Sequence, residues 1–154
     1  PSWIAQSAMV LSRERMSCST TPPPFGVYAP VVCFFTEDEE IDFPSVTHHV
    51  QRLLSSGVRG LVLHGSNGEA THLSQEERLE VIRHVRTLIK ESGSSAVIMS
   101  GCSSNSVRET RKLIEDAQKA GADYALVLPP SYWVAAMTKP VLKDFYLEVR
   151  CLGS

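Results

Sequence analysis

The chain has 154 residues, of which 43% are hydrophobic and 21% are charged, a composition typical of a soluble protein with one globular core. Its 15 basic and 17 acidic residues give a formal net charge of -2, and no basic block is interleaved with aromatic residues, so we expect no nucleic-acid partner. No apolar run approaches the length of a membrane span, and we expect no membrane partner either.

The N-terminal segment, residues 1–24, is predicted to be a disordered tail. It ends in Ser19-Thr20-Thr21-Pro22-Pro23-Pro24, a composition that favours extended and solvated backbone. The apolar stretch 4–11 is followed, rather than preceded, by Arg13 and Arg15, which is the wrong order for a secretory signal. Because the chain begins with Pro1, Met16 is a candidate translation start for the native protein.

The cysteines bear on the compartment in which the protein works. They form no C-x-x-C pair, and they are too sparse for a disulfide-stapled scaffold. The four are Cys18, Cys33, Cys102 and Cys151. Scattered cysteines of this kind favour a reducing compartment, the cytoplasm, with the mitochondrion as the alternative.

Four short apolar runs follow the tail and predict β-strands near residues 27–34, 60–64, 96–100 and 123–128. They lack strict alternation, as expected for strands covered on both faces of a parallel sheet. Amphipathic helices are predicted after the strands. The first follows Asp42-Phe43-Pro44, the next two begin with capping boxes at Ser74-Gln75-Glu76-Glu77 and Ser106-Val107-Arg108-Glu109, and the fourth begins after Pro140.

This alternation of strands and helices predicts an α/β fold. Residues 57–63 and 121–128 are near-repeats of one pattern of helix end, turn and strand, so the repeating unit is βα. Two architectures contain such units: an open doubly wound sheet, and a (β/α)8 TIM barrel, whose complete form needs about 250 residues. The chain is long enough for about half of such a barrel.

The loop Gly65-Ser66-Asn67-Gly68-Glu69 follows the second predicted strand and precedes the second helix. Glycines let the backbone turn sharply and approach a ligand, while Ser66 and Asn67 offer a hydroxyl, an amide and two successive backbone N–H groups. Such donors at the carboxyl end of a strand suit a small anion, either a carboxylate or a phosphate.

These motifs together resemble the dihydrodipicolinate synthase / N-acetylneuraminate lyase family of Schiff-base aldolases. The resemblance covers roughly residues 25–150 and is closest to the 4-hydroxy-2-oxoglutarate aldolase and fungal deoxy-sugar-acid aldolase branches. It rests on five segments in register, which are Gly26-Val27-Tyr28-Ala29-Pro30, the loop 65–69, Ser74-Gln75-Glu76-Glu77-Arg78, Gly101-Cys102 and Pro129-Pro130-Ser131-Tyr132.

The resemblance implies a class I aldolase, a lyase that acts on pyruvate or a similar 2-oxo acid through a Schiff base, on a TIM barrel of which this chain covers the first four βα units. It implies substrate binding by Gly65, Ser66, Asn67 and Gly68, with the pyruvate carboxylate on the N–H groups of Ser66 and Asn67. It also implies a catalytic proton relay between the Ser66 hydroxyl and Tyr132 of a neighbouring subunit, hence a homo-oligomer, either a dimer or a tetramer. No cofactor is expected.

The chain departs from the family pattern at three places. The first strand ends in Cys33-Phe34-Phe35 rather than in a Thr-Pro-Phe phrase, and the fourth loop has Ser131-Tyr132-Trp133 where two tyrosines and an asparagine are frequent. The family's Schiff-base lysine and main catalytic tyrosine lie on its sixth and fifth strands, beyond this chain. The end, residues 151–154, matches nothing in the family, and we expect the chain alone to be inactive.

Other catalytic groups fit the sequence less well. The five histidines lack H-E-x-x-H or a matching cysteine spacing, so no metal site is expected. Glu37-Asp38-Glu39-Glu40 is predicted to be a solvated loop before a helix. The lysines are expected on helices or loops, in contact with solvent; they are Lys90, Lys112, Lys119, Lys139 and Lys143.

Two alternatives to an aldolase remain open. One is a non-catalytic product of the same gene that associates with full-length subunits through the Tyr132 loop. The other is an α/β phosphate- or nucleotide-binding module gripping its ligand with residues 65–69, which ranks last because neither G-x-x-x-x-G-K-[ST] nor G-x-G-x-x-G occurs.

Overall fold

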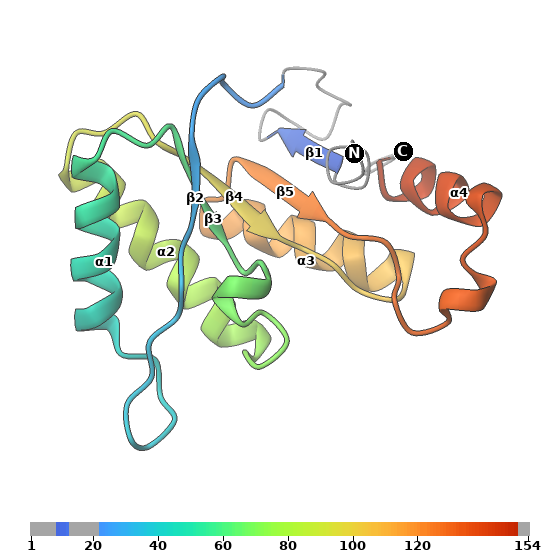
Figure 1. Cartoon of the computed structure of the whole chain (residues 1–154), viewed down its shortest axis with the longest axis horizontal. Coiled ribbons are helices and arrows are strands. Elements are labelled where there is room, and N and C mark those ends of the chain that lie inside the picture. The colour runs from blue at the N-terminus through green and yellow to red at the C-terminus, as the bar shows by residue number, and fades with distance from the viewer. Residues whose placement is uncertain (1–8, 13–21, 151–154) are drawn as a thin grey trace.

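The computed structural model describes residues 9–12 and 22–150, and it contains one five-stranded sheet in the order β1-β5-β4-β3-β2 (Figure 1). The strands are β1 (Met9–Ser12), β2 (Tyr28–Pro30), β3 (Gly60–Leu63), β4 (Val97–Gly101) and β5 (Tyr124–Val127). The helices are α1 (Phe43–Ser55), α2 (Gln75–Glu91), α3 (Val107–Ala120) and α4 (Lys139–Arg150), with two 3-10 turns, η1 (Ser66–Gly68) and η2 (Val134–Ala136).

Strands β2 to β5 pair in parallel, each with the next strand along the chain. This confirms the four predicted βα units and their sequential order. The first strand is shorter than the predicted run 27–34: it ends at Pro30, whose nitrogen has no hydrogen to donate to a neighbouring strand. The chain then leaves the sheet and forms an isolated antiparallel bridge between Phe35 and Ile41 before α1.

Local capping contacts explain where the helices begin. The Asp42 side chain caps α1 by accepting a hydrogen bond from the Ser45 N–H at 3.2 Å. Both halves of the predicted capping box on α2 are present, with Ser74 Oγ accepting from the Glu77 N–H and Glu77 accepting from the Ser74 N–H at 2.6 Å. At α3 the serine half is formed, from the Glu109 N–H to Ser106 Oγ at 3.1 Å.

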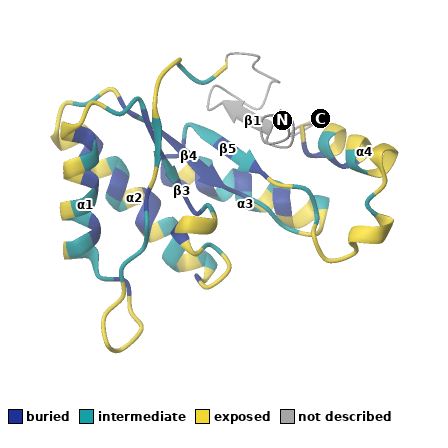
Figure 2. Cartoon of the chain, viewed as in Figure 1, coloured by how far each residue is buried: buried dark blue, intermediate teal, exposed yellow. Residues whose placement is uncertain are grey.

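The two faces of the sheet differ in burial, and the strands carry both buried and half-buried residues (Figure 2). Directly paired residues of parallel strands point to the same face, so the registers divide the side chains into two sets. The set on the face covered by the helices is buried: Leu61, Leu63, Ile98, Ser100, Ala125 and Val127. The opposite set is mostly half-buried, including Tyr28, Val62, Val97, Tyr124 and Leu126. The strands were expected to be covered on both faces, and in the described chain only one face is fully covered.

Strand β1 lies within the segment that was expected to be a disordered tail. Met9–Ser12 pair antiparallel with β5, in the register Met9 with Val127 and Ser12 with Tyr124 (Figure 1). The pairing differs from the expectation because the edge of β5 presents free N–H and C=O groups to any extended segment within reach. Residues 1–8 and 13–21 of the predicted tail, and the predicted non-family end 151–154, lie outside the described residues.

Helix α4 packs on α3 and also contacts β5. Phe145 and Val149 are buried, and the Tyr146 hydroxyl donates to the Val127 carbonyl at 3.4 Å. Arg111 on α3 donates through Nε to the Glu148 carbonyl at 3.1 Å. Of the helices in the described ranges, none has the length and apolar character that crossing a membrane requires.

Candidate functional site

The loops that follow β3, β4 and β5 all begin at the carboxyl ends of these strands, because the three strands are parallel and adjacent (Figure 1). This row of strand ends is called the carboxyl edge of the sheet below, as distinct from the outer side of an end strand. The first of these loops, Gly65–Glu69, is called the glycine loop below. Residues 102–106 follow β4, and residues 128–138 follow β5 and contain Tyr132. In open and closed α/β sheets this edge is where ligands bind.

The glycine loop forms one 3-10 turn, η1. The Gly68 N–H donates to the Gly65 carbonyl at 3.1 Å, and the Glu69 N–H donates to the Ser66 carbonyl at 3.2 Å. The N–H groups of Ser66 and Asn67 donate to no group within the described residues, and both residues are exposed. The turn therefore offers two neighbouring free N–H donors to solvent or to a ligand.

Close packing, rather than a left-handed backbone, explains Gly68 and the neighbouring Gly101. A Cβ atom on Gly68 would lie 2.9 Å from the Val31 carbonyl oxygen, and one on Gly101 would collide with the His64 carbonyl. The left-handed conformations at this turn belong to His64, with φ of 56°, and to Glu69, with φ of 50°. The expectation that the loop glycines supply the sharp turn therefore differs from the observed backbone.

Cys33 holds the glycine loop from the first βα unit. Its thiol donates to the Gly68 carbonyl at 3.3 Å. Burial, with smaller contributions from Glu69 and Glu77, raises the pKa of the Cys33 thiol to about 11, so the group stays protonated and remains a donor at neutral pH. Sequence analysis did not assign this role, although the replacement of the family's threonine by Cys33 marked the position.

His64 is the residue directly before the glycine loop, and only 3% of it is exposed. Its Nδ1 lies 3.3 Å from Ser100 Oγ on β4. Burial, and secondarily the positive charge of Arg78, lower the pKa of His64 to about 3, so the ring is neutral near pH 7. In the part of the chain that the structure describes, no three histidine, cysteine or acidic side chains come together as a metal site would require.

Tyr132 lies on the loop after β5, and 73% of it is exposed. Asn105, after β4, fixes the backbone of this loop, because its Oδ1 accepts from the N–H groups of Ser131 at 2.9 Å and Tyr132 at 3.1 Å. The Tyr132 ring contacts the Trp133 ring edge to face at 5.0 Å. Ser66 and Tyr132 thus share one edge of the sheet, but among the described residues no hydrogen bond joins them. Asn105 was missed by the sequence analysis.

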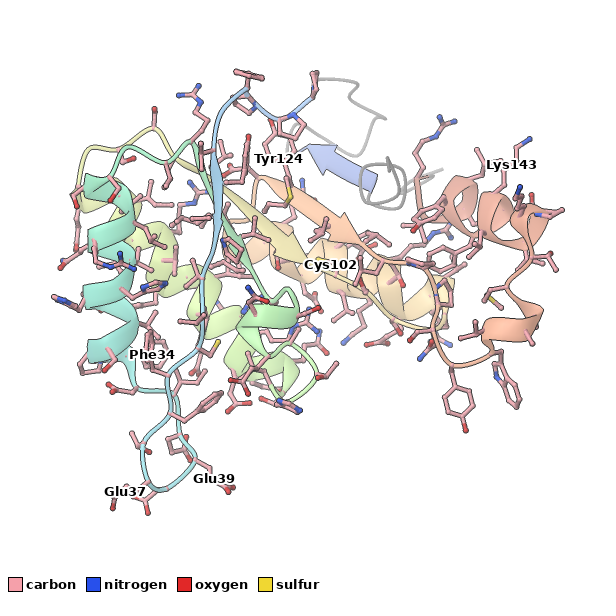
Figure 3. The ribbon with its side chains drawn as sticks, in the orientation of Figure 1. Phe34, Glu37, Glu39, Cys102, Tyr124 and Lys143 are labelled. Carbon is pink, nitrogen blue, oxygen red and sulfur yellow. The ribbon has the colours of Figure 1, made fainter. Side chains whose placement is uncertain are left out.

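The charged groups considered as alternatives lie away from this edge or in solvent. All five lysines are exposed on α2, α3 and α4, as expected, and Lys143 projects from the outside of α4 (Figure 3). Glu37 and Glu39 lie at the tip of the loop between β2 and α1, away from the sheet (Figure 3). The predicted solvated acidic loop is therefore confirmed.

One protein family matches this chain both in sequence and in the arrangement of its strands and helices. The model of the dihydrodipicolinate synthetase family matches residues 23–150. A dihydrodipicolinate synthase family protein from Coccidioides immitis is 39% identical with a TM-score of 0.76, over 85% of this chain and 41% of that chain. YagE, a prophage protein of the same family from E. coli K12 solved in complex with pyruvate, is 31% identical with a TM-score of 0.71, over 81% of this chain and 41% of its own.

Curated relatives with similar sequences are named aldolases. A probable mitochondrial 4-hydroxy-2-oxoglutarate aldolase from Emericella nidulans is 42% identical over 125 residues, which are 80% of this chain and 40% of the relative. An L-threo-3-deoxy-hexylosonate aldolase from Hypocrea jecorina is 42% identical over 132 residues, which are 83% of this chain and 42% of the relative. The chain therefore spans about two fifths of the length of these relatives.

Proposed function

Because the chain belongs to the dihydrodipicolinate synthetase family and forms the N-terminal part of its TIM barrel, we propose that the protein containing it is a class I aldolase. Such a lyase forms or cleaves a carbon–carbon bond through a pyruvate Schiff base. The aldolase names of the relatives from Emericella nidulans and Hypocrea jecorina support this reaction class, and the YagE complex supports pyruvate as the ligand. We place the protein in the cytoplasm or the mitochondrion, the second because of the Emericella relative.

The observation that carries the proposal is the pair of free N–H donors at Ser66 and Asn67. They are adjacent and exposed at the carboxyl edge of the parallel sheet. A carboxylate has two oxygens that can accept both bonds at once, and charge-assisted bonds of this kind are stronger than neutral ones. In the proposal, Gly65 and Gly68 are the other two residues of this substrate-binding loop. The loop binds the carboxylate of the 2-oxo acid.

The proposed proton relay uses two subunits. The Ser66 hydroxyl can pass protons at the substrate carbonyl during carbinolamine formation and dehydration. Tyr132 is the second member: its side chain is exposed and, among the described residues, makes no hydrogen bond to Ser66 of its own chain, which favours a role toward a neighbouring subunit. The active protein would then be a homo-oligomer.

The proposal assigns the Schiff-base lysine to a strand beyond residue 150. Each lysine of this chain is exposed on a helix, and none lies on a strand of the sheet. A nucleophilic lysine needs burial or a nearby cation that lowers its pKa. We therefore assign to this chain the N–H groups of Ser66 and Asn67, called the carboxylate cradle below, and the Tyr132 side chain. The covalent bond to the substrate is not assigned to any residue of this chain.

Titration with pyruvate tests the cradle in the chain itself. Amide NMR shifts of Ser66 and Asn67 are expected to move with saturation, while those of the distant turn at Gly93 stay fixed. Pyruvamide, which has the same shape without the negative charge, is the matched control and is expected to give much smaller shifts. Equal responses to both ligands, or no response of the two amides to pyruvate, would contradict the assignment.

Substitution of Ser66 tests the relay in a protein that carries the whole barrel. Ser66→Ala is expected to slow turnover by about ten- to a thousand-fold, because it removes a proton-transfer group and leaves the backbone donors in place. Unaltered kinetics would remove Ser66 from the mechanism while leaving the carboxylate cradle intact.

A further inference from the structure

A small pocket, partly open to solvent, lies behind the glycine loop, between the sheet and helices α2 and α3. Its lining includes His64, Arg78, Ser100, Cys102, Gln75 and Asp116, and its volume is about 10 Å³. That is about the room of a single water molecule. Cys102 on this wall is completely enclosed, and Figure 3 shows it in the middle of the molecule at the end of β4.

Two polar groups of this pocket have unused hydrogen-bonding capacity. The Nε2 atom of His64 is buried and contacts no hydrogen-bond partner within the described residues. Arg78 is half-buried and donates through Nη2 to the Gly101 carbonyl, and its other N–H groups donate to no described residue. By contrast, Gln75 and Asp116 are bonded to each other and to Lys112.

We propose that one ordered water joins Arg78 to Nε2 of His64 in this pocket and so sets the proton on Nδ1, and that the resulting bond from Nδ1 of His64 to Ser100 positions the glycine loop. His64 is then a positioning residue. It touches no substrate, and it acts through the backbone of the glycine loop, which begins at the next residue. The link to a bound carboxylate rests on the proposed function, but the water and the bonds of His64 do not.

The chemistry of the groups fixes the proton on the ring. A guanidinium has donors and no acceptor, so a water beside Arg78 accepts from it and has its own O–H to give. In the proposed network this O–H points to Nε2, which is therefore the unprotonated acceptor. The neutral ring consequently carries its proton on Nδ1 and donates it to Ser100 Oγ, 3.3 Å away.

The position of His64 in the backbone explains why these bonds matter for the loop. Its φ of 56° is a left-handed value that a side chain with a Cβ adopts only when its surroundings hold it there. Its carbonyl lies against Gly101, and the next residue is Gly65. Fixing the ring therefore fixes the direction in which the chain leaves β3 and enters the glycine loop.

Magic-angle-spinning NMR of the full 154-residue chain labelled with ¹⁵N-histidine tests the proton assignment without requiring a monomer. The His64 signal, identified by its loss in His64→Asn, is expected to show a protonated Nδ1 and an unprotonated Nε2, with a cross-peak from Nε2 to a slowly exchanging water. A proton on Nε2, or a ring without a water contact, would overturn the proposal whether or not any variant folds.

Hydrogen exchange tests the positioning role. His64→Leu is expected to speed exchange of the bonded Gly68 and Glu69 amides by about fivefold, the effect of losing one buried hydrogen bond. His64→Asn keeps a donor at the position of Nδ1 and tolerates the left-handed backbone, so exchange should stay within about twofold of the unmodified chain. His48→Leu, at an exposed histidine of α1, is the matched control and should leave both amides unchanged.

Two outcomes of this experiment would count against the proposal. Equal exchange in His64→Leu and the unmodified chain would show that the ring does not hold the loop, and equal acceleration in His64→Asn and His64→Leu would show that the bond to Ser100 is not the contact that matters. If both readouts agree with expectation but pyruvate leaves Ser66 and Asn67 unaffected, the proposed function fails and the positioning role of His64 stands.

Discussion

Burial of His64 makes the stability of the folded chain depend on pH. The folded pKa is about 3, below the ordinary value of 6.5, so the unfolded chain binds more protons between these two values. The free energy of unfolding should therefore fall as the pH drops from about 6.5 towards about 3, by up to about 1.4 kcal/mol per pH unit for this one group. Urea titrations at several pH values and one protein concentration measure the slope.

The same titrations of His64→Asn provide the comparison. Burial also lowers the pKa values of His49 and His84, and their contributions remain in the variant. The slope should accordingly be shallower in His64→Asn. An unchanged or steeper slope would mean that His64 is already charged, or solvated, in the folded chain.

Cys33 should react slowly with alkylating reagents. Its thiol pKa is raised from 9.0 to about 11, so at pH 8 the thiolate fraction falls by about two orders of magnitude, and the thiolate is the nucleophile. Iodoacetamide labelling followed by peptide mass spectrometry should show this delay relative to the same cysteine in urea-unfolded chain. Equal rates in the two states would contradict the burial of the Cys33 thiol and its raised pKa.

At the level of strands and loops, Gly101 is expected to tolerate no side chain. The Cβ atom of Gly101→Ala would meet the backbone of His64, which cannot rotate away, so we expect a loss of about 1–3 kcal/mol in the free energy of unfolding. Gly65→Ala is the matched control because its nearest neighbour would be Val62 Cγ1 at 4.0 Å and its φ is -79°. Urea unfolding of both variants should separate them, and similar stabilities would contradict this account of the β3–β4 contact.

The elements that could be predicted from the sequence are those with local causes. The capping box at Ser74 and the helix end at Gly121 involve residues close in the chain, and both occur where the pattern indicated. The features that were not predicted depend on distant partners. β1 pairs with β5 across more than a hundred residues, and the left-handed φ of His64 depends on Ser100 and Gly101.

In the candidate site, too, features with local causes could be predicted and features that depend on distant residues could not. The sequence motif located the glycine loop at the carboxyl end of a strand, which the structure confirms. Cys33 and Asn105 were missed because each acts on a backbone group about thirty residues away, at Gly68 and at Tyr132. No local pattern encodes such a contact until the strand order is known.

For the whole molecule, we expect no covalent trapping of pyruvate by this chain. Schiff-base formation needs a neutral amine, and all five lysines are exposed on helices. Incubation with pyruvate and borohydride, followed by intact mass measurement, should therefore show no stable adduct. An adduct on any lysine would overturn this expectation, and a longer protein with the complete barrel serves as the positive control.

The partly covered sheet face should make the chain associate with itself. Val62 and Leu126 are half-buried on that face, and Trp133 and Val134 are exposed beyond β5. Light scattering is expected to report a mass above that of a monomer. Val62→Ser should lower the association if the sheet face is responsible, and Val134→Ser if η2 is; a monodisperse, cooperatively unfolding monomer would contradict both.

The pairing of β1 with β5 affects which surface of the sheet is expected to cause self-association. Half of a barrel would leave its last strand, β5, with an unpaired edge, but β1 covers that edge, and β2 is the barrel strand that pairs with only one neighbour among the described residues. It has three residues and ends in Pro30, features that make an edge a poor template for another strand. Association through the sheet face is therefore expected to exceed association through the edge.

The residues that support the glycine loop and the loop containing Tyr132 are synthesised in a fixed order. The Cys33 thiol precedes the Gly68 carbonyl that it holds, and Asn105 precedes the Tyr132 loop that it fixes. A ribosome makes the chain from the N-terminus, so Cys33 and Asn105 leave the exit tunnel before the loops that they contact, whereas Ser100 leaves it after the glycine loop. The glycine loop can thus complete the contacts described here once β4, which carries Ser100 and Gly101, has been made.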